Sequence, residues 1–470
     1  MGFLGNSSLL QKSDFLASCE AVGSNATVPK RKLRFRLYSL LLVVDCLCIA
    51  LSFGFVGLIW GTRWLSLEGI NLTAMIVPIY LGVAVNRRTY SREAIDSPSQ
   101  SAVHAVLSII FTMLAVQCVL YFSHVSESIS RVGLTLGVLF SAISLGAIRY
   151  PFSRYARGIM QDQLTDEVVL LDGFYPTLDK RFHVVDAQAS GISADLNDPY
   201  MLSRIGSWLA AFDKVVVACP PERRSAWAIV LQGAGIQGEF LIPDLIGPNV
   251  IGLGRIGKYD THIVSRGPLN MSSRFQKRLL DLCLTLPVLL FLAPFLALVA
   301  LAIKLDSPGS VLFTQYRVGR GNQLFKIKKF RSMYVHSTDS VGATSASRED
   351  ARITRVGRIL RRTSIDELPQ LFNVLSGDMS IVGPRPHALG STAESKLFWE
   401  VDQHYWRRHA LKPGITGLAQ IRGFRGATEC EADLQNRLRA DLEYLSHWTL
   451  LREFTIILKT FAVLMHRNAY

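Results

Sequence analysis

Long apolar runs that alternate with polar, arginine-rich segments mark the first third of the chain. Four such runs cover residues 37–60, 72–85, 103–122 and 132–147. A helix needs about 20 apolar residues to cross a bilayer, and the first and third runs reach that length. We therefore predict four transmembrane helices within residues 30–157.

Basic residues lie at one end of each apolar run. They precede the first run at residues 30–36, follow the second at Arg87 and Arg88, and follow the fourth from Arg149 on, whereas residues 123–130 hold none. The positive-inside rule places these basic ends, and everything after Arg149, in the cytoplasm. We expect a multi-pass membrane protein. Asp45, inside the first run, is expected to serve helix packing or the interface rather than act as a functional intramembrane acid.

Composition agrees with a membrane protein that meets anionic partners. Hydrophobic residues make up 49% of the 470 residues, and the formal net charge is +14. Such a charge suits nucleic acid, anionic lipid or a phosphorylated substrate. The seven cysteines show no zinc-ligand spacing, and an odd number cannot pair completely, which favours a reducing compartment. Residues 1–29 are polar and lack periodicity, which predicts a disordered tail.

Residues 158–270 predict a Rossmann-like α/β domain. Short β-branched runs alternate with helical stretches, as in parallel sheets with crossover helices. The expected strands are 168–171, 182–185 and 215–217, and the expected helices are 200–212 and 225–232.

A glycine-rich segment in this domain matches the dinucleotide fingerprint G-x-G-x-x-G at residues 233–238. The fingerprint binds a pyrophosphate only between a preceding strand and a following helix. Here it follows the helical stretch and precedes the strand-like residues 239–242. We therefore interpret it as a helix-to-strand turn and expect no NAD.

The last part, residues 271–470, begins with an apolar stretch over residues 279–303. Pro287 and Pro294 interrupt this stretch, and basic residues flank it on both sides. A spanning helix would carry one basic flank to the outside, against the positive-inside rule. We favour a re-entrant membrane helix broken at Pro294, because proline removes a backbone hydrogen bond and permits a kink.

Two adjacent carboxylates, Asp366 and Glu367, follow a run of arginines that recur every three residues from Arg352 to Arg361. Ser364 and Glu367 have the spacing of a capping box, which predicts a helix start. Near a helix N-terminus both acids would stay ionised, and an anionic substrate would be attracted. An isolated cap paired to arginines is the simpler alternative.

The surrounding blocks resemble those of the bacterial sugar transferases, the polyprenyl-phosphate sugar-1-phosphate transferases or monotopic phosphoglycosyl transferases. The matching blocks span Arg274 to about Lys459, and the upstream helices and α/β domain resemble the larger branch of that family. The blocks are residues 329–333, 350–354, 363–370, 377–380, 382–386, 412–420 and 441–444. The chain departs from the family pattern at Ala293-Pro294, where Ser-Pro is common, and after Trp448, where a common Asp is absent.

The resemblance implies a membrane protein with four transmembrane helices, a Rossmann-like domain and a mainly α catalytic domain with the re-entrant helix. It implies transfer of sugar-1-phosphate from a UDP-sugar to undecaprenyl phosphate on the cytoplasmic face of the bacterial inner membrane, with UMP released. Asp366 would be the nucleophile, and Glu367 its partner. Mg²⁺ would be held by Asp366 and Glu367. The expected substrate-binding residues are Lys329, Arg331, Arg361, Arg385, Pro386 and Asp441.

Several alternatives stay open from the sequence. A glycosyltransferase that moves the sugar alone would release UDP instead of UMP, and a scaffold of polysaccharide export would lack activity. The sugar is expected to be glucose, with galactose as the alternative. Nucleic acid is not expected, because the basic residues border the membrane segment without interleaved aromatic residues. We also expect a homodimer, with the α/β domain as a dimerisation or regulatory module.

Overall fold

A computed structural model describes the chain in two compact units, which meet in sequence between Asp166 and Glu167. The predicted tail, residues 1–29, lies outside the described residues. The described residues are 30–60, 67–87, 89–91, 95–122, 130–160, 166–176, 178, 182–241, 251–256, 259–335, 350–424, 428 and 430–465.

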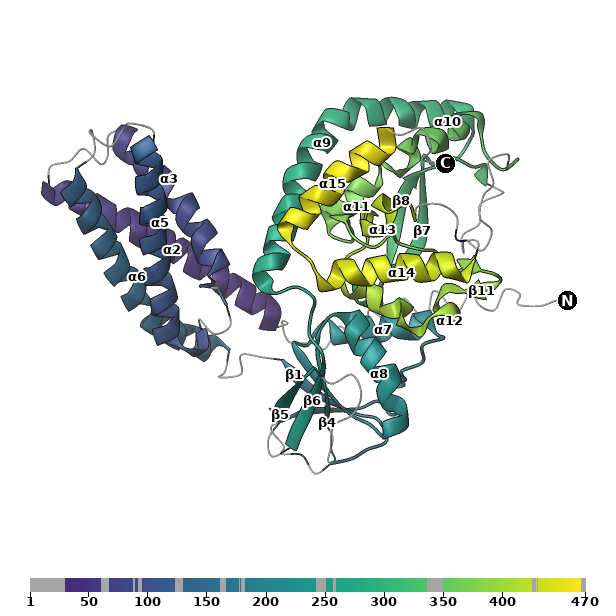
Figure 1. Ribbon diagram of the computed structural model, residues 1–470, viewed down its shortest axis with the longest axis horizontal. Coiled ribbons are helices and arrows are strands. Elements are labelled where there is room, and N and C mark those ends of the chain that lie inside the picture. Colours follow the sequence, from purple (N-terminus) through teal and green to yellow (C-terminus); the bar gives the residue numbers. More distant parts are fainter. Residues whose placement is uncertain are drawn as a thin grey trace. The chain divides into compact units, whose positions relative to one another are not determined.

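The first unit contains four long helices (Figure 1): α2 (Lys30–Trp60), α3 (Leu67–Asn86), α5 (Pro98–Phe122) and α6 (Arg131–Ile159). Three of them, α2, α5 and α6, are long and apolar enough to cross a membrane, as predicted. The predicted second span lies in α3, whose described apolar part, Thr73–Asn86, is shorter. Among the described residues, the fourth helix of sufficient length belongs to the second unit.

A buried ion pair joins α2 to α6 inside this bundle. Arg149 Nη2 lies 2.7 Å from Asp45 Oδ2, and both side chains are inaccessible to solvent. Tyr90 and Tyr80 donate hydrogen bonds to the same oxygen at 2.8 and 3.0 Å. Asp45 therefore serves helix packing, the role expected from its sequence position.

Breaking this pair should destabilise the bundle. Arg149→Met leaves the Asp45 charge buried without its cation, which typically costs about 3–5 kcal/mol. Thermal unfolding in detergent should show a much lower midpoint for this variant than for Arg154→Met, since Arg154 is exposed on the same helix. Equal midpoints for the two variants would contradict a stabilising role for the pair.

The second unit begins with a six-stranded mixed sheet in the order β2-β1-β3-β4-β6-β5. The first four strands are parallel, and β5 and β6 form an antiparallel hairpin against β4. The strands are β1 (Glu167–Leu171), β2 (His183–Asp186), β3 (Lys214–Ala218), β4 (Gln237–Leu241), β5 (Gly252–Ile256) and β6 (Tyr259–Ser265). The parallel part matches the predicted runs, whereas the hairpin was not predicted.

Two helices of this sheet, α7 (Pro199–Leu209) and α8 (Pro221–Ala234), share one hydrophobic cluster with it. Both crossovers step along the sheet in the same direction, so right-handed connections place both helices on the same face. The glycine-rich segment joins α8 to β4, with Gly235 in the left-handed conformation at the end of the helix. The prediction of a helix-to-strand turn is therefore confirmed.

The helix α9 (Met271–Asp306) is 36 residues long and continuous over both internal prolines. The interruption expected at Pro294 is thus not a gap in the helix, although α9 changes direction strongly along its length (Figure 1). A proline removes one backbone donor, which permits such a bend without ending the helix. Many of its large apolar side chains are exposed, including Leu290 at 69% and Phe291 at 83%.

After α9 the chain forms a β-hairpin and a set of short helices, and this region contains the sequence blocks, within residues 329–444, on which the resemblance rests. The hairpin, β7 (Leu312–Val318) and β8 (Leu324–Phe330), was not predicted for a mainly α region. The turn between them is η1 (Arg320–Asn322). The helices that follow are α10 (Arg355–Thr363), η3 (Ile365–Glu367), α11 (Gln370–Ser376), α12 (Phe398–Val401), η4 (Gln403–Ala410), α13 (Leu418–Ile421), α14 (Glu431–Ser446) and α15 (Leu450–Met465).

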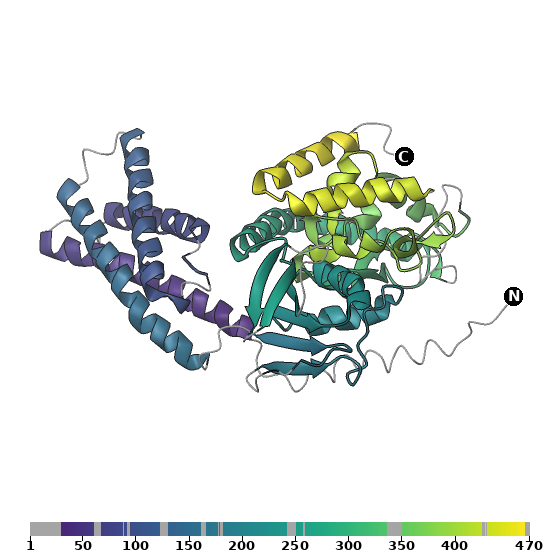
Figure 2. The same ribbon diagram turned by 60° about the horizontal axis from the view of Figure 1, so that its bottom comes forward.

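Two pairs of short strands complete the region, β9 (Ser380–Val382) with β12 (Gly414–Thr416) and β10 (Thr392–Ala393) with β11 (Lys396–Leu397). The last two helices, α14 and α15, both pack against α13 and are drawn in yellow in Figure 2. The C-terminal half of α9 packs on α10, η3 and α11 through Leu296, Val299 and Ile303. The segment η3, which holds the carboxylate pair, therefore packs on apolar side chains of α9.

Candidate active site

The carboxylate pair lies on the 3-10 turn η3, between α10 and α11. Ser364 precedes it with φ +57°, in the left-handed region, and makes no capping hydrogen bond to η3. The predicted capping box is therefore wrong, because an N-cap residue needs an extended backbone to aim its side chain at the next turn. Thr354 provides such a cap instead, accepting from Gly357 N at the start of α10.

Glu367 is held by two cations from different elements. Lys329 Nζ, on β8, donates to Glu367 Oε1 at 2.9 Å. Arg385 donates to both carboxylate oxygens, at 2.7 Å from Nη2 and 3.4 Å from Nη1. Burial alone would raise the pKa of Glu367, but Arg385 and Lys329 outweigh burial and hold this pKa well below its usual value. Glu367 is therefore ionised throughout the neutral range.

Asp366 has a different environment. Burial raises its pKa above the usual value, and the neighbouring Glu367 charge adds to the rise, while Lys329, Arg361 and Arg385 oppose it. Within the described part of the chain, no hydrogen bond engages the Asp366 carboxylate. The two adjacent acids thus differ in pKa, and of the two only Glu367 accepts hydrogen bonds from described side chains. Such a difference is typical of sites where two carboxylates have separate roles.

The structure brings three of the predicted basic residues to the pair. Lys329 and Arg385 contact Glu367 directly. Arg361, near the end of α10, acts on the Asp366 charge. Pro386 is buried next to Arg385, and its carbonyl accepts from Arg317 at 3.4 Å. Guanidinium and ammonium groups in this arrangement can bind phosphate oxygens.

Two other predicted residues lie elsewhere. Arg331 is buried and donates to the carbonyl oxygens of Ile303 and Ser307 at the end of α9. Arg331 therefore caps the C-terminal end of that helix. Asp441, on α14, is 2% exposed and forms an ion pair with Arg408 at 2.7 Å. No contact of either side chain with the carboxylate pair occurs among the described residues.

Arg317, on β7, is a member of the site that the sequence did not single out. It lies near Arg385 and Glu367, and burial together with the Arg385 charge lowers the pKa of Arg317 to about 10. One guanidinium nitrogen donates to Gln315 Oε1 at 2.6 Å. Its charge alone could not identify it in a chain with 51 basic residues. Its place beside the carboxylate pair follows from the pairing of β7 with β8, which the sequence analysis did not predict.

Comparison with known proteins places these features in one class. The bacterial sugar transferase family matches residues 272–467, which include all but the first residue of α9, the carboxylate pair and the basic residues of the candidate site. The exopolysaccharide production protein PSS of Rhizobium leguminosarum bv. phaseoli is 50% identical over 184 residues, 39% of this chain and 92% of that protein. The chain belongs to the bacterial sugar transferase family.

Longer relatives share the same region. The undecaprenyl-phosphate glucose phosphotransferase of Komagataeibacter xylinus is 43% identical over 264 residues, which is 55% of this chain and 50% of that protein. The UDP-glucose:undecaprenyl-phosphate glucose-1-phosphate transferase of Escherichia coli (strain K12) is 42% identical over 240 residues, 49% of this chain and 50% of that protein. The chain thus matches about half the length of these two relatives.

Proposed function

We propose that the protein transfers glucose-1-phosphate from UDP-glucose to undecaprenyl phosphate, releasing UMP, as the first step of exopolysaccharide assembly. The observation that carries the proposal is the carboxylate pair, in which Glu367 is fixed by Lys329 and Arg385 while Asp366 stays unengaged. The names of the two glucose-transferring relatives support the choice of sugar. Galactose is the alternative sugar.

The chemistry follows from the different states of the two acids. An Asp366 carboxylate oxygen attacks the sugar-bearing phosphorus of UDP-glucose and forms a new P–O bond, while the bridging P–O bond breaks and UMP leaves. An oxygen of the lipid phosphate then attacks the same phosphorus, and the aspartyl P–O bond breaks to restore the carboxylate. Lys329, Arg361 and Arg385 offset the negative charge of the reacting phosphates, as preorganised cations do in phosphoryl transfer.

A divalent cation fits this donor set. Mg²⁺ prefers oxygen ligands and commonly binds one or two carboxylates together with substrate phosphates. Asp366 and the less tightly held Oε2 of Glu367 could hold it, although no cluster of three or more acidic, histidine or cysteine ligands occurs among the described residues. When bound, the ion would neutralise phosphate charge.

The reaction should depend on the ionisation of Asp366. Because the pKa of Asp366 is raised and the nucleophile must be deprotonated, kcat/KM should be lost as pH falls through that pKa. Lys329→Met removes a charge that lowers this pKa, so the acidic limb should move to higher pH. Lys326→Met, an exposed position on the same strand, is the matched control and should leave the limb in place. An unmoved limb in Lys329→Met would contradict the assignment.

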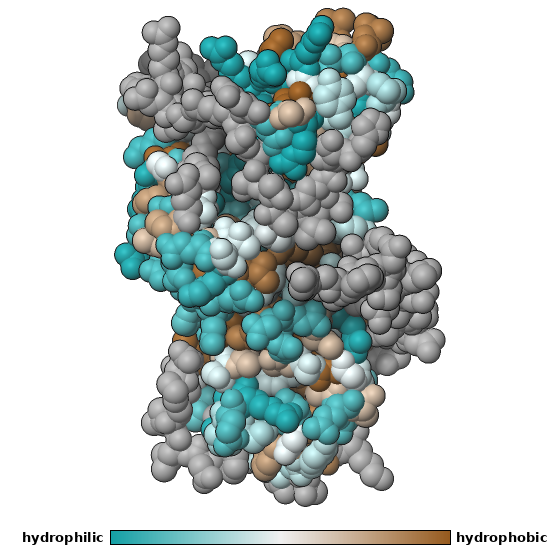
Figure 3. Space-filling model, turned by 90° about the vertical axis from the view of Figure 1, so that its right-hand side faces the viewer, coloured by the Kyte–Doolittle hydropathy of each residue, from teal (hydrophilic) through white to brown (hydrophobic). Residues whose placement is uncertain are grey.

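We propose that α9 enters the membrane and returns on the same side, which keeps the site at the cytoplasmic face. Supporting this, the N-terminal half and the C-terminal end of α9 both contact the region that follows it: Asp281 accepts from Ser380 and Ile381, and Asp306 accepts from Val356. Exposed apolar side chains of α9 suit contact with lipid. In Figure 3 several hydrophobic residues lie at the upper end of the face shown, beside hydrophilic ones, and others lie in its middle.

Topology mapping tests the re-entrant helix. A reporter inserted after Ser307 should give a cytoplasmic signal, the same as a reporter inserted after Met160. A periplasmic signal after Ser307, with a cytoplasmic one after Met160, would mean that α9 crosses the bilayer. The homodimer stays a prediction that the mass of the purified protein in detergent can test.

Product analysis tests the function itself. Membranes that contain the protein should convert UDP-glucose and undecaprenyl phosphate to UMP and a glucose-labelled diphosphate lipid. Release of UDP would indicate a glycosyltransferase that moves sugar alone, and no turnover with any sugar would favour a scaffold. A panel of radiolabelled UDP-sugars in the same assay separates glucose from galactose.

A further inference from the structure

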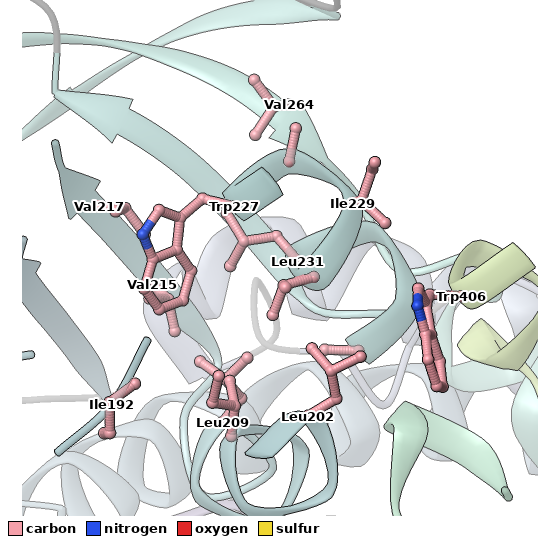
Figure 4. Packing of buried hydrophobic residues seen from close by; sticks show 14 of the residues in the cluster. Ile192, Leu202, Leu209, Val215, Val217, Trp227, Ile229, Leu231, Val264 and Trp406 are labelled. Atoms are coloured by element: carbon pink, nitrogen blue, oxygen red, sulfur yellow. The ribbon is translucent and has the colours of Figure 1, made fainter. Parts of the chain in front are cut away.

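The α/β domain and the catalytic region share one hydrophobic core. Trp406, on η4, lies in the same cluster as Trp227 and Leu231 of α8 and Leu202 of α7. Figure 4 shows Trp406 on the same side of the cluster as Leu231 and Leu202, opposite Val215 and Val217 of β3. The indole Nε1 of Trp406 donates to Leu196 O at 3.0 Å. The α/β domain is thus packed directly on η4.

The glycines of the turn between α8 and β4 allow this close packing. A Cβ atom on Gly233 would lie 2.7 Å from Trp406 O and 2.6 Å from the Asn322 side chain, distances that carbon atoms do not tolerate. A Cβ on Gly235 would lie 2.8 Å from Ala410 O. The glycines therefore bring the end of α8 against the backbone of η4.

Polar contacts tie the same surface to the hairpin β7–β8. Gln323 Nε2 donates to Gly206 O at 3.0 Å, and Leu324 N donates to Ser203 Oγ at 3.0 Å. The ring of His409 pairs with Asn322 at 2.9 Å. The strands of this hairpin carry Arg317 and Lys329. The α/β domain therefore supports β7 and β8, which both line the site.

The helix η4 in turn holds the loop that carries Arg385. Arg408 Nη2 donates to Arg385 O at 2.8 Å, and Arg408 Nη1 lies 2.7 Å from His387 Nδ1. Burial and the Arg408 charge hold the pKa of His387 well below its usual value, so the neutral ring can accept this hydrogen bond. Asp441 forms an ion pair with Arg408 and thereby fixes its guanidinium group. The Arg408 side chain is only 1% exposed.

We propose that the α/β domain positions Arg385 for substrate binding, acting through Trp406 and Arg408 of η4. The contacts run without a gap from α8 to η4, from Arg408 to the backbone of Arg385, and from Arg385 to Glu367. Asp441 is on this reading a positioning residue, which acts through Arg408 rather than on the substrate. The inference rests on the proposed function, because it assigns Arg385 to the nucleotide-sugar phosphates.

The physical reason is that this site tolerates little displacement. A shift of η4 would leave the Arg385 carbonyl without its charged donor and would move the guanidinium that Glu367 and the substrate share. Misplacement of a binding group by about 1 Å can cost roughly 100-fold in rate.

The test compares full-length variants in detergent. Gly233→Ala forces η4 away from α8, whereas Gly158→Ala adds the same methyl group in helix α6 where no atom lies within 4 Å. Gly233→Ala should weaken UMP binding, measured by calorimetry, and raise the KM for UDP-glucose by about 10-fold each, while the KM for the lipid acceptor changes less than about twofold. Asp441→Asn should shift the same two quantities in the same direction, and Gly158→Ala should shift neither.

A purely structural role would give a different result. If Gly233→Ala and Asp441→Asn lower only the fraction of folded protein, with UMP affinity and both KM values unchanged in that fraction, the positioning role is wrong. Trp406→Ala removes the indole from the shared core and should resemble Gly233→Ala. UMP binding is measured without turnover, so a parent protein that binds UMP but transfers no sugar phosphate would instead refute the proposed function.

Discussion

Asp366→Asn is expected to abolish transfer, with a fall in kcat on the order of 10³-fold or more. The amide cannot form the acyl phosphate bond, whereas its shape is close to that of the carboxylic acid. Asp366 makes no described hydrogen bond, so the substitution should leave the fold intact. Release of UMP from UDP-glucose, measured in the absence of lipid acceptor, should disappear together with lipid product.

The matched control is Asp260→Asn, at a position on β6 where the side chain is 80% exposed. This variant should retain the activity and the thermal stability of the parent. A large residual activity in Asp366→Asn, with UMP still released before lipid is added, would contradict the nucleophile assignment. Loss of folded protein in Asp366→Asn alone would show up as a lower unfolding midpoint and can be separated from loss of chemistry.

Glu367→Gln is expected to have the second largest effect. The neutral amide no longer balances Lys329 and Arg385, so both cations lose their half-buried anionic partner and their fixed positions. We expect a loss of roughly 100-fold in kcat/KM, the scale of a displaced binding group. The Glu367 charge raises the pKa of Asp366, so its removal should also move the acidic limb of the pH profile to lower pH.

Glu431→Gln provides the control for that variant, because Glu431 forms a comparable ion pair with Lys396 at 2.8 Å on the surface. Exposed pairs of this kind contribute little, so both activity and stability should be nearly unchanged. An acidic limb that stays in place, or moves to higher pH, in Glu367→Gln would mean that the two acids are not coupled as the geometry indicates.

Local patterns predicted the parts of the fold that depend on local physics. Apolar runs predicted the four long helices of the first unit and the apolar part of α9, and β-branched runs predicted the parallel strands β1 and β3 to within one residue at each end. The hairpin β5–β6 was not predicted, because Gly252 and Gly254 weaken the strand pattern of β5. The packing of α8 on η4 could not be read from the sequence either, since it depends on segments about 170 residues apart.

In the site, too, the residues were predicted from local sequence, whereas their backbone conformation and packing were not. The carboxylate pair and Lys329, Arg361 and Arg385 were found from the sequence blocks, and the structure groups them. Ser364 misled the prediction, because a spacing of three residues does not reveal a left-handed backbone. Arg331 lies two residues after Lys329, yet β8 ends at Phe330 and the chain then turns Arg331 towards the end of α9.

The most direct measurement of the central claim is mass spectrometry of the protein after a brief incubation with UDP-glucose in the absence of lipid acceptor. The proposed mechanism predicts a hexose phosphate adduct on the peptide that contains Asp366, and its disappearance when undecaprenyl phosphate is added. Lipid product formed at the normal rate, while no adduct is found on that peptide, would contradict it.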